Sequence, residues 1–346
     1  MLSIRHQIRF AATLTILLAL VAFFSCALGA DLPQLRISLP PGMGSLPVAL
    51  AEEWELFEEY GLAVDLVGLR DNEARNLAIY AGDIDGMVCD VTLAIMLASI
   101  GADIVITSTA YRSEGTGSLA LLSQSYFDID SVGDLLARTQ RGSDLKSIAI
   151  LESSDIEYHI DMLLASLGYP VDSDKYYSYW NDMVQLAAFL SMGSVYAAVL
   201  PEPYITYLNN LLPASANMSL VNLSDFDGID LLPSIIVFRR AVIEEKTELV
   251  ERFYAAYREA VRMLNGSSQE EVISMGTSEA VRLFFPGLKE DSVPVGIMDS
   301  FEIPQFPQPQ MLSEKEYDNA RLWVAGRHDE WQCPSYEEIT TDYFLQ

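Results

Sequence analysis

The chain places polar and aromatic side chains in short loops, each directly after an apolar run. These loops are PGMGS (41–45), CDVT (89–92), AYRSEGTGS (110–118), ESSD (152–155), YWND (179–182) and LPEPY (200–204). In open parallel sheets, ligands bind outside the carboxyl ends of the strands. We therefore expect these loops to form a small-molecule site.

Two of the loops lead into helices and contain hydroxyl and carboxyl groups. Ser153 and Ser154 can bind an anion together with the free N–H groups of the following helix turn. The alternative role is ordinary helix capping, by Ser154 or Asp155. Asp90 and Thr92 open another helix, where Asp90 also fits an N-cap. Both roles stay open for these loops.

A cationic side chain and a glycine-containing loop are further candidates. Arg112 can pair bidentately with a carboxylate, sulfonate or phosphate. The alternative role of Arg112 is a surface ion pair with Glu114, which would contribute little to the stability of the fold. Gly44 and Ser45 can let a ligand approach the backbone, or can form an ordinary turn.

Aromatic residues in three of the loops suggest what kind of ligand to expect. Tyr111, Trp180 and Tyr204 can stack on a ring, although each alone is equally a core aromatic. Together they favour a flat organic ligand over a bare inorganic anion. Glu202 can accept a hydrogen bond from an amine or an amino-pyrimidine, or it can cap the helix that begins at Pro203.

The order of predicted elements repeats along the chain. GDIDGMVCD (82–90) and GSVYAAVLP (193–201) both join a helix that stops at glycine to an apolar strand. Strands alternate with helices around both copies, which predicts parallel pairing. We expect an α/β fold of two lobes, each a mostly parallel sheet flanked by helices, with a cleft between them.

The remaining elements are less regular. The segment 231–266 predicts a strand and then a long amphipathic helix with Leu249, Phe253, Tyr257 and Val261 on one face. Residues 301–311 are rich in proline and should be extended. Helices are expected at 46–61, 313–327 and 334–346.

Short motifs in a fixed order carry a resemblance to a known family. They are Ala51, Leu56, Phe57, Gly61, Leu62 and Val64; Leu77, Gly82 and Asp85; Asp134, Leu135, Leu145, Lys146 and Ile150; Leu190, Gly193, Ala197, Glu202 and Pro203; and Leu232, Pro233, Ser234 and Val237. In this order the chain resembles the solute-binding proteins of ABC transporters, in the group that takes nitrate, sulfonates, taurine and the thiamine pyrimidine. Glu55 departs from the motif, because it stands where the first glycine is usual.

The resemblance implies a type II periplasmic-binding-protein fold with two crossings between lobes. Lobe 1 would comprise 31–118 plus 228–346, and lobe 2 would comprise 119–227. Closure around the ligand by hinge motion would then be read by a membrane permease. The resemblance also implies a monomer without a cofactor. An aromatic heterocycle, such as a thiamine-pyrimidine precursor or a flavin-like vitamin, is the first expected ligand, and a small sulfonate or carboxylate is the second.

The first thirty residues have the layout of a secretory signal peptide. Arg5 and Arg9 precede a long apolar run that ends in small residues, as such leaders require. Lipidation at Cys26 and an uncleaved membrane anchor are alternatives. We therefore expect an exported protein, in the periplasm or on the outer face of the cytoplasmic membrane.

Charge and cysteine content exclude several other classes. The net charge is −28, and loss of the leader would leave 19 basic and 49 acidic residues. Such a surface repels phosphate backbones, so nucleic-acid binding is not expected. No cysteine or histidine spacing indicates a metal site. Cys89 and Cys333 could form a disulfide in an exported protein, a question the sequence leaves open.

Two other functions remain alternatives to transport. A eukaryotic pyrimidine synthase shares the fold, but the histidine and the cysteine-rich run on which it relies are not matched, since His159 lies within a predicted helix. No nucleophile elbow or histidine-centred triad can be assembled, so we expect no enzyme activity. The other alternative is a ligand sensor that serves a membrane receptor.

Overall fold

The structure is a computed structural model, and it describes residues 32–69, 71–113, 118–140, 147–212, 219–286, 288, 296–328 and 330–345. The expected leader with Cys26, and Glu114 of the alternative ion pair, lie outside these residues. The elements below belong to the compact unit Gln34–Gln346.

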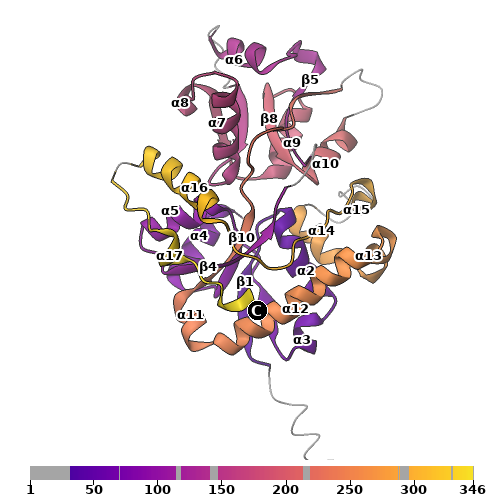
Figure 1. Cartoon of the computed structure of the whole chain (residues 1–346). Coiled ribbons are helices and arrows are strands. Elements are labelled where there is room, and N and C mark those ends of the chain that lie inside the picture. The colour runs from indigo at the N-terminus through magenta and orange to yellow at the C-terminus, as the bar shows by residue number, and fades with distance from the viewer. Residues whose placement is uncertain are drawn as a thin grey trace, which may run out of the picture. The chain divides into compact units, whose positions relative to one another are not determined.

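Two five-stranded mixed sheets organise this unit (Figure 1). Sheet A contains, in spatial order, β2 (Ala63–Leu66), β1 (Gln34–Ser38), β3 (Gly86–Cys89), β10 (Ser234–Arg239) and β4 (Ile104–Tyr111). Sheet B contains, in the same manner, β7 (Tyr177–Trp180), β6 (Ile148–Leu151), β8 (Ala197–Pro201), β5 (Leu119–Gln124) and β9 (Leu220–Ser224).

The two sheets share one topology. Three strands run parallel at one side of each sheet, and the fourth strand in spatial order is antiparallel to both of its neighbours. That antiparallel strand is β10 in sheet A and β5 in sheet B, and each enters its sheet directly after the chain has left the other one. The expected α/β fold of two mostly parallel, helix-flanked sheets is confirmed.

Helices flank both sheets, and we name each sheet with its helices a lobe. Lobe 1 has sheet A with η1 (Met43–Ser45), α2 (Leu46–Glu53), α3 (Leu56–Glu59), α4 (Asn72–Ala81), α5 (Val91–Ser99), α11 (Arg240–Glu245), α12 (Thr247–Gly266), α13 (Gln269–Met275), α14 (Ser278–Phe284), α15 (Ile297–Ser300), α16 (Glu314–Arg327), α17 (Tyr336–Ile339) and η4 (Tyr343–Leu345). Lobe 2 has sheet B with η2 (Ser125–Phe127), α6 (Val132–Gln140), α7 (Asp155–Ser166), α8 (Ser173–Tyr176), α9 (Met183–Ser191) and α10 (Tyr204–Leu211).

Sheet A is buried on both faces, as the apolar runs of its strands require. Along β10, Ile235 and Val237 pack into the cluster that contains α5 and α16, whereas Ile236 and Phe238 pack into the cluster that contains α2 and α12. The alternation follows the two-residue period of a strand. Figure 1 shows these two helix layers on opposite sides of the sheet.

The amphipathic helix expected after β10 forms as α11 and α12. Of its predicted face, Phe253, Tyr257 and Val261 are fully buried, and Leu249 is half-buried against the same cluster. Phe253 stacks on Phe57 of α3 with ring centroids 5.4 Å apart. An aromatic layer therefore fixes α12 on sheet A.

The two repeated glycines end helices, as the sequence predicted. Gly82 follows α4 with φ 83°, and Gly193 follows the end of α9 with φ 69°. Only glycine adopts this left-handed conformation at no steric cost, so both helices stop there. Each stop leads into β3 or β8, the third strand of its sheet.

Two predicted helices differ from the structure. The expected helix 46–61 is divided into α2 and α3, because Glu55 has φ 57° and interrupts the helical ladder. The prediction of a helix at 334–346 is wrong. Only the single turn α17 and η4 form there, and Thr340 instead makes a parallel bridge to Ile106 on the edge of sheet A.

Cys89 and Cys333 do not form a disulfide in the structure. Cys89 is buried and Cys333 half-buried, and both thiols are free.

Among the described residues, no helix combines the length and the hydropathy that a membrane span would need.

Asp85 anchors sheet A, and its removal tests that role. The Asp85 carboxylate is buried and accepts hydrogen bonds from Arg36 N at 2.8 Å, Lys246 Nζ at 3.2 Å and Arg239 Nη2 at 3.3 Å. Loss of one member of such a network leaves the others unpaired. We expect Asp85→Ala to lower the free energy of unfolding by about 3 kcal/mol in urea titrations.

An exposed ion pair provides the control for Asp85. Asp103 pairs with Arg240 at 2.8 Å, but its side chain is 71% exposed. Asp103→Ala should therefore cost less than about 1 kcal/mol. Equal losses in the two variants would contradict the anchoring role of Asp85.

Candidate functional site

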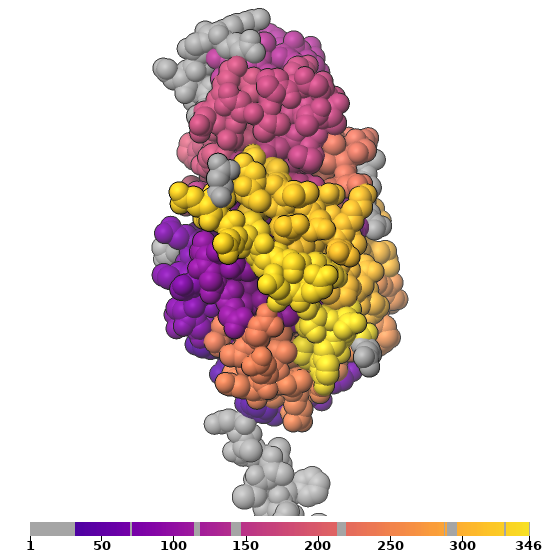
Figure 2. Space-filling view, turned by 60° about the vertical axis from the view of Figure 1, so that its left-hand side comes forward, coloured from indigo at the N-terminus to yellow at the C-terminus, as the bar shows by residue number. Residues whose placement is uncertain are grey.

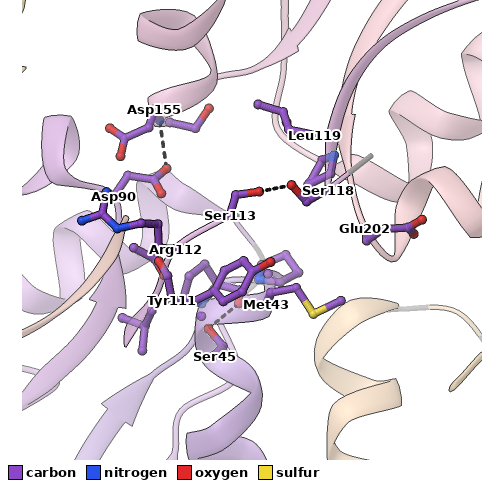
Figure 3. A pocket seen from close by; sticks show the side chains of 18 of the residues that line it. Met43, Ser45, Asp90, Tyr111, Arg112, Ser113, Ser118, Leu119, Asp155 and Glu202 are labelled. Atoms are coloured by element: carbon purple, nitrogen blue, oxygen red, sulfur yellow. Dashed lines mark hydrogen bonds between the residues drawn. The ribbon is translucent and has the colours of Figure 1, made fainter. Parts of the chain in front are cut away.

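A cavity of about 870 Å³ lies at the carboxyl ends of strands from both sheets. It is lined by the loops after β1, β3, β4, β6 and β8, together with residues of the extended segment 300–310. Figure 3 shows the side chains converging on it from both lobes. This is the position at which open α/β sheets bind ligands.

Most of the residues predicted from the sequence line this cavity. They are Gly44, Ser45, Asp90, Tyr111, Arg112, Ser153, Ser154 and Glu202. The other three predicted residues, Thr92, Trp180 and Tyr204, are not among its lining residues.

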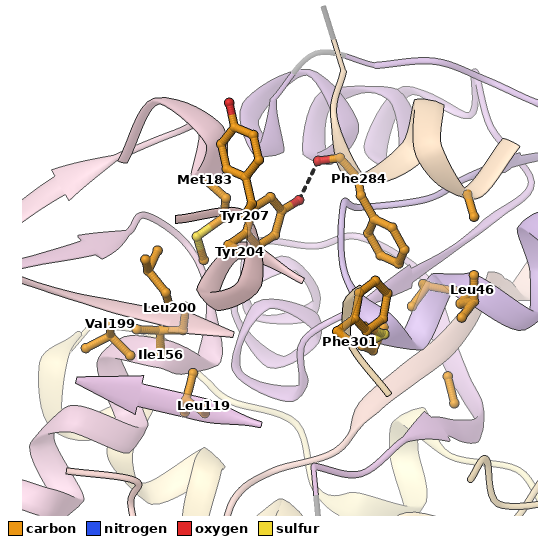
Figure 4. Packing of buried hydrophobic residues seen from close by; sticks show 14 of the residues in the cluster. Leu46, Leu119, Ile156, Met183, Val199, Leu200, Tyr204, Tyr207, Phe284 and Phe301 are labelled. Carbon is orange, nitrogen blue, oxygen red and sulfur yellow. Dashed lines mark hydrogen bonds between the residues drawn. The ribbon is translucent and has the colours of Figure 1, made fainter. Parts of the chain in front are cut away.

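The three residues outside the lining have structural contacts instead. Trp180 packs on Phe189 with ring centroids 4.8 Å apart. Tyr204 is fully buried, and its hydroxyl donates to Phe284 O at 2.7 Å, which joins α10 of lobe 2 to α14 of lobe 1 (Figure 4). Thr92 is buried beneath the cavity floor, where it bonds to Asp155.

Asp90 and Asp155 cap each other's helices across the lobes. Asp155 Oδ1 accepts from Thr92 N at 2.9 Å, and its Oδ2 accepts from Val91 N at 3.1 Å, so the side chain caps α5. In return, Asp90 Oδ2 accepts from Asp155 N at 3.1 Å, at the start of α7 (Figure 3). Neither aspartate caps in the way the sequence suggested, because each cap comes from the opposite lobe. A carboxylate at a helix N-terminus is stabilised by the free N–H groups and the helix dipole.

Burial changes the protonation of this pair. Desolvation raises the pKa of Asp155 most strongly, and the neighbouring charge of Asp90 adds to the effect. Desolvation also raises the pKa of Asp90, against the hydrogen bond from Asp155 N and the charge of Arg75. The charge of Asp90 therefore disfavours ionisation of Asp155, as expected for neighbouring carboxyl groups in a buried site.

Both arginines of the cavity lining are already engaged. Arg112 pairs with Glu316 of α16, and its Nη1 also lies 3.4 Å from Leu231 O. Arg75 is buried and donates to Leu69 O at 3.2 Å and to Asn72 Oδ1. The proposed pairing of Arg112 with Glu114 involves a residue outside the described ranges.

His159 is a lining residue that the sequence did not indicate as part of the site. It is 6% exposed, and its Nε2 accepts from Leu232 N at 2.9 Å across the lobes. Burial lowers the pKa of His159 to about 3. The ring is therefore neutral, with its proton on Nδ1, and Nδ1 has no hydrogen-bond partner among the described residues.

Glu202 and the serines complete the polar lining. Glu202 Oε2 accepts from Thr206 N at 3.1 Å, as the capping alternative predicted, and burial raises the pKa of the carboxyl group. Ser154 Oγ donates to Leu151 O at 2.8 Å, and Ser45 Oγ donates to Pro40 O at 2.8 Å. A Cβ on Gly44 would lie 2.0 Å from Ser234 Oγ, so this glycine is needed for close packing of β10.

Several lining residues were missed because their neighbours are remote in sequence. Phe306, whose ring centroid lies 5.5 Å from that of Tyr111, comes from the proline-rich segment. Asp155 was considered only as a cap of its own helix. The one available signal was that Asp90 and Asp155 each lie at the start of a helix that follows an apolar strand, one in each lobe.

Comparison with known proteins identifies the fold. No protein-family model and no curated protein matches the chain. Among solved structures, the periplasmic aliphatic sulphonate binding protein SsuA from Escherichia coli has a TM-score of 0.67 at 19% identity, covering 91% of this chain and 99% of that one.

Two further structures show the same likeness. The alkanesulfonate-binding protein SsuA from Xanthomonas axonopodis pv. citri, bound to MOPS, has a TM-score of 0.65 at 18% identity, covering 90% of this chain and 99% of that one. The periplasmic nitrate-binding protein NrtA from Synechocystis PCC 6803 has a TM-score of 0.66 at 11% identity, covering 91% and 88%. The chain thus has the fold of periplasmic binding proteins, and the expected likeness to the nitrate and sulfonate group is confirmed at the level of the fold.

The pH dependence of stability tests the coupled carboxylates. Because the pKa of Asp155 is raised on folding, this group binds more protons in the folded than in the unfolded state above pH 4, and its contribution to stability falls as the pH rises. Asp155→Asn keeps a hydrogen-bond acceptor but removes this titration. We expect the loss of stability between pH 5 and pH 8 to be smaller in the variant by at least about 1.4 kcal/mol, one pKa unit.

Asp172→Asn is the matched control, because Asp172 is exposed and caps α8 by accepting from Lys175 N at 3.0 Å. It should keep the wild-type pH dependence in thermal or urea unfolding. An unchanged dependence in Asp155→Asn would show that this carboxyl group does not titrate as proposed.

Proposed function

We propose that the chain is the solute-binding component of an ABC-type importer and captures a small organic ligand between its lobes. The observation that carries this proposal is the cavity of about 870 Å³, which is lined by strand-to-helix loops of both sheets. A cavity of this volume suits a molecule of drug-like size. Its walls belong to both lobes, so binding would couple to their relative position.

The fold supports a role in transport. Proteins with this architecture include periplasmic sulphonate- and nitrate-binding proteins. The leader expected at residues 1–30 fits an exported protein, and a membrane permease would be its partner. If Cys26 carries a lipid, the protein would be tethered to the membrane that holds the permease.

Hinge closure would act through two connections. The chain passes from sheet A to sheet B between β4 and β5, and it returns between β9 and β10. Both connections lead into the antiparallel strands of the sheets. Rotation of the lobes about these two segments would open the cavity without breaking either sheet.

The cavity wall favours an organic ligand with an apolar or aromatic part. Of the three aromatic residues expected to stack, only Tyr111 lines the cavity, but Phe301 and Phe306 join it there. Tyr111 and Phe306 are tilted by 49°. An aromatic heterocycle therefore remains the first ligand class, and a sulfonate or carboxylate the second.

A cavity-filling variant tests ligand capture. Ser113 lines the cavity (Figure 3) and is half-exposed. We expect compounds that raise the melting temperature of the wild type by mass action to bind Ser113→Trp at least about tenfold more weakly, a loss of about 1.4 kcal/mol by calorimetry. Mass spectrometry should recover these compounds unchanged after incubation.

Ser274→Trp places the same side chain at an exposed position of α13, away from the cavity, and should retain wild-type affinity. Equal binding by both variants would place the ligand elsewhere. Chemical conversion of a bound compound would favour the enzyme alternative over transport.

A further inference from the structure

Carboxylates of the chain occupy the helix N-termini at the cavity, where an anion would otherwise bind. Asp155 accepts from Val91 N and Thr92 N at the start of α5, and Thr92 Oγ1 also donates to it. Asp90 accepts from Asp155 N at the start of α7. An anionic ligand at either helix would have to displace a carboxyl group that already occupies these N–H donors.

The cationic side chains of the lining already have protein partners. Arg112 is paired with Glu316. Arg75 is buried and donates to the neutral acceptors Asn72 Oδ1 and Leu69 O, and the charges of Asp71 and Asp90 act on it. Among the described residues that line the cavity, no other arginine or lysine is present. A sulfonate or carboxylate would therefore have to share a guanidinium group that already donates to the protein.

Acceptor groups remain on both sides of the cavity. Asp90 Oδ2 is used by Asp155 N, and no described residue hydrogen-bonds to Asp90 Oδ1. Figure 3 shows Glu202 at the opposite side, with Ser113 and Ser118 between the two carboxylates. Glu202 is a lining residue whose two oxygens accept from Thr206 N and Thr206 Oγ1, so each oxygen retains accepting capacity.

His159 supplies a second and independent sign of a ligand. It is more than nine-tenths buried and lines the cavity, yet Nδ1 has no partner among the described residues. An unpaired buried donor costs free energy that a ligand acceptor could recover. The site therefore has carboxylate acceptors, and His159 adds a buried neutral donor that needs an acceptor on the ligand.

We propose that the ligand of this cavity is an organic cation, with an ammonium or amidinium group held by Asp90 or Glu202, an acceptor atom for His159 Nδ1 and an apolar body against Tyr111 and Phe306. This inference rests on the proposed function, since it names the ligand class of the same cavity. Coulomb attraction in a partly desolvated cavity favours such a ligand. The net charge of −28 would add long-range attraction for cations.

Phenyl-bearing probes of different charge test the ligand charge. We would titrate wild-type protein with 2-phenylethylamine, benzamidine, 2-phenylethanol, 3-phenylpropanoate and 2-phenylethanesulfonate, and follow the melting temperature and the heat of binding. We expect the amine or the amidine to bind at least tenfold more tightly than either anion. High salt should weaken cation binding by screening.

Removing the charge of one cavity carboxylate at a time shows which of them binds the cationic group of the ligand. Glu202→Gln keeps an acceptor for Thr206 N but removes the charge, and Asp90→Asn does the same at the other wall. At least one of the two should lower amine affinity fivefold or more while leaving 2-phenylethanol binding unchanged. Glu314→Gln removes an exposed carboxylate of α16 outside the cavity lining and should have no effect.

The outcomes separate this inference from the proposed function. Tighter binding of the sulfonate or the carboxylate, or unchanged amine affinity in both cavity variants, would overturn the organic cation and leave solute capture standing. Failure of every charge class to bind at 10 mM would count against both. If a variant does not fold, the ranking of probes on the wild type still decides.

Discussion

The contact between Asp90 and Asp155 determines how the two lobes meet. Each carboxylate satisfies N–H groups at the start of the other's helix, so α5 and α7 face each other with their N-termini neutralised. His159 and Leu232, at 2.9 Å, add a second bond between the lobes beside this contact. The cavity exists where it does because these bonds set its floor.

Further bonds between the lobes lie at the sides of the cavity. On one side, Trp323 Nε1 of α16 donates to Asp161 Oδ2 of α7 at 2.8 Å, and Arg327 pairs with the same carboxylate. Figure 2 shows the C-terminal segment, in yellow, lying over lobe 1 and reaching lobe 2. On the other side, Tyr204 bonds to Phe284 O. Aromatic rings also meet across the lobes, because the ring centroids of Tyr204 and Tyr207 lie 6.0 and 5.0 Å from that of Phe285. Lobe separation would therefore break these polar bonds and also expose apolar surface.

Features set by local rules could be predicted from the sequence. Gly82 and Gly193 stop helices because φ is positive there, and the spacing of Phe253, Tyr257 and Val261 identified the buried face of α12. Glu55 shows the limit of such rules, because the backbone takes the left-handed conformation that glycine favours with a glutamate in place. Thr340 was expected in a helix, but pairing with Ile106 overrides local propensity.

The charge of the site could not be predicted, because it depends on partners far apart in the chain. Arg112 looked like an anion ligand until Glu316, 204 positions away, was placed beside it. Asp90 and Asp155 looked like caps of their own helices, and 65 positions separate the donor and acceptor that join them. In this fold the helix N-termini always point toward the ligand space. The groups that occupy these helix N-termini then decide the charge that the ligand can have. A fold shared with sulfonate- and nitrate-binding proteins therefore does not by itself imply an anionic ligand.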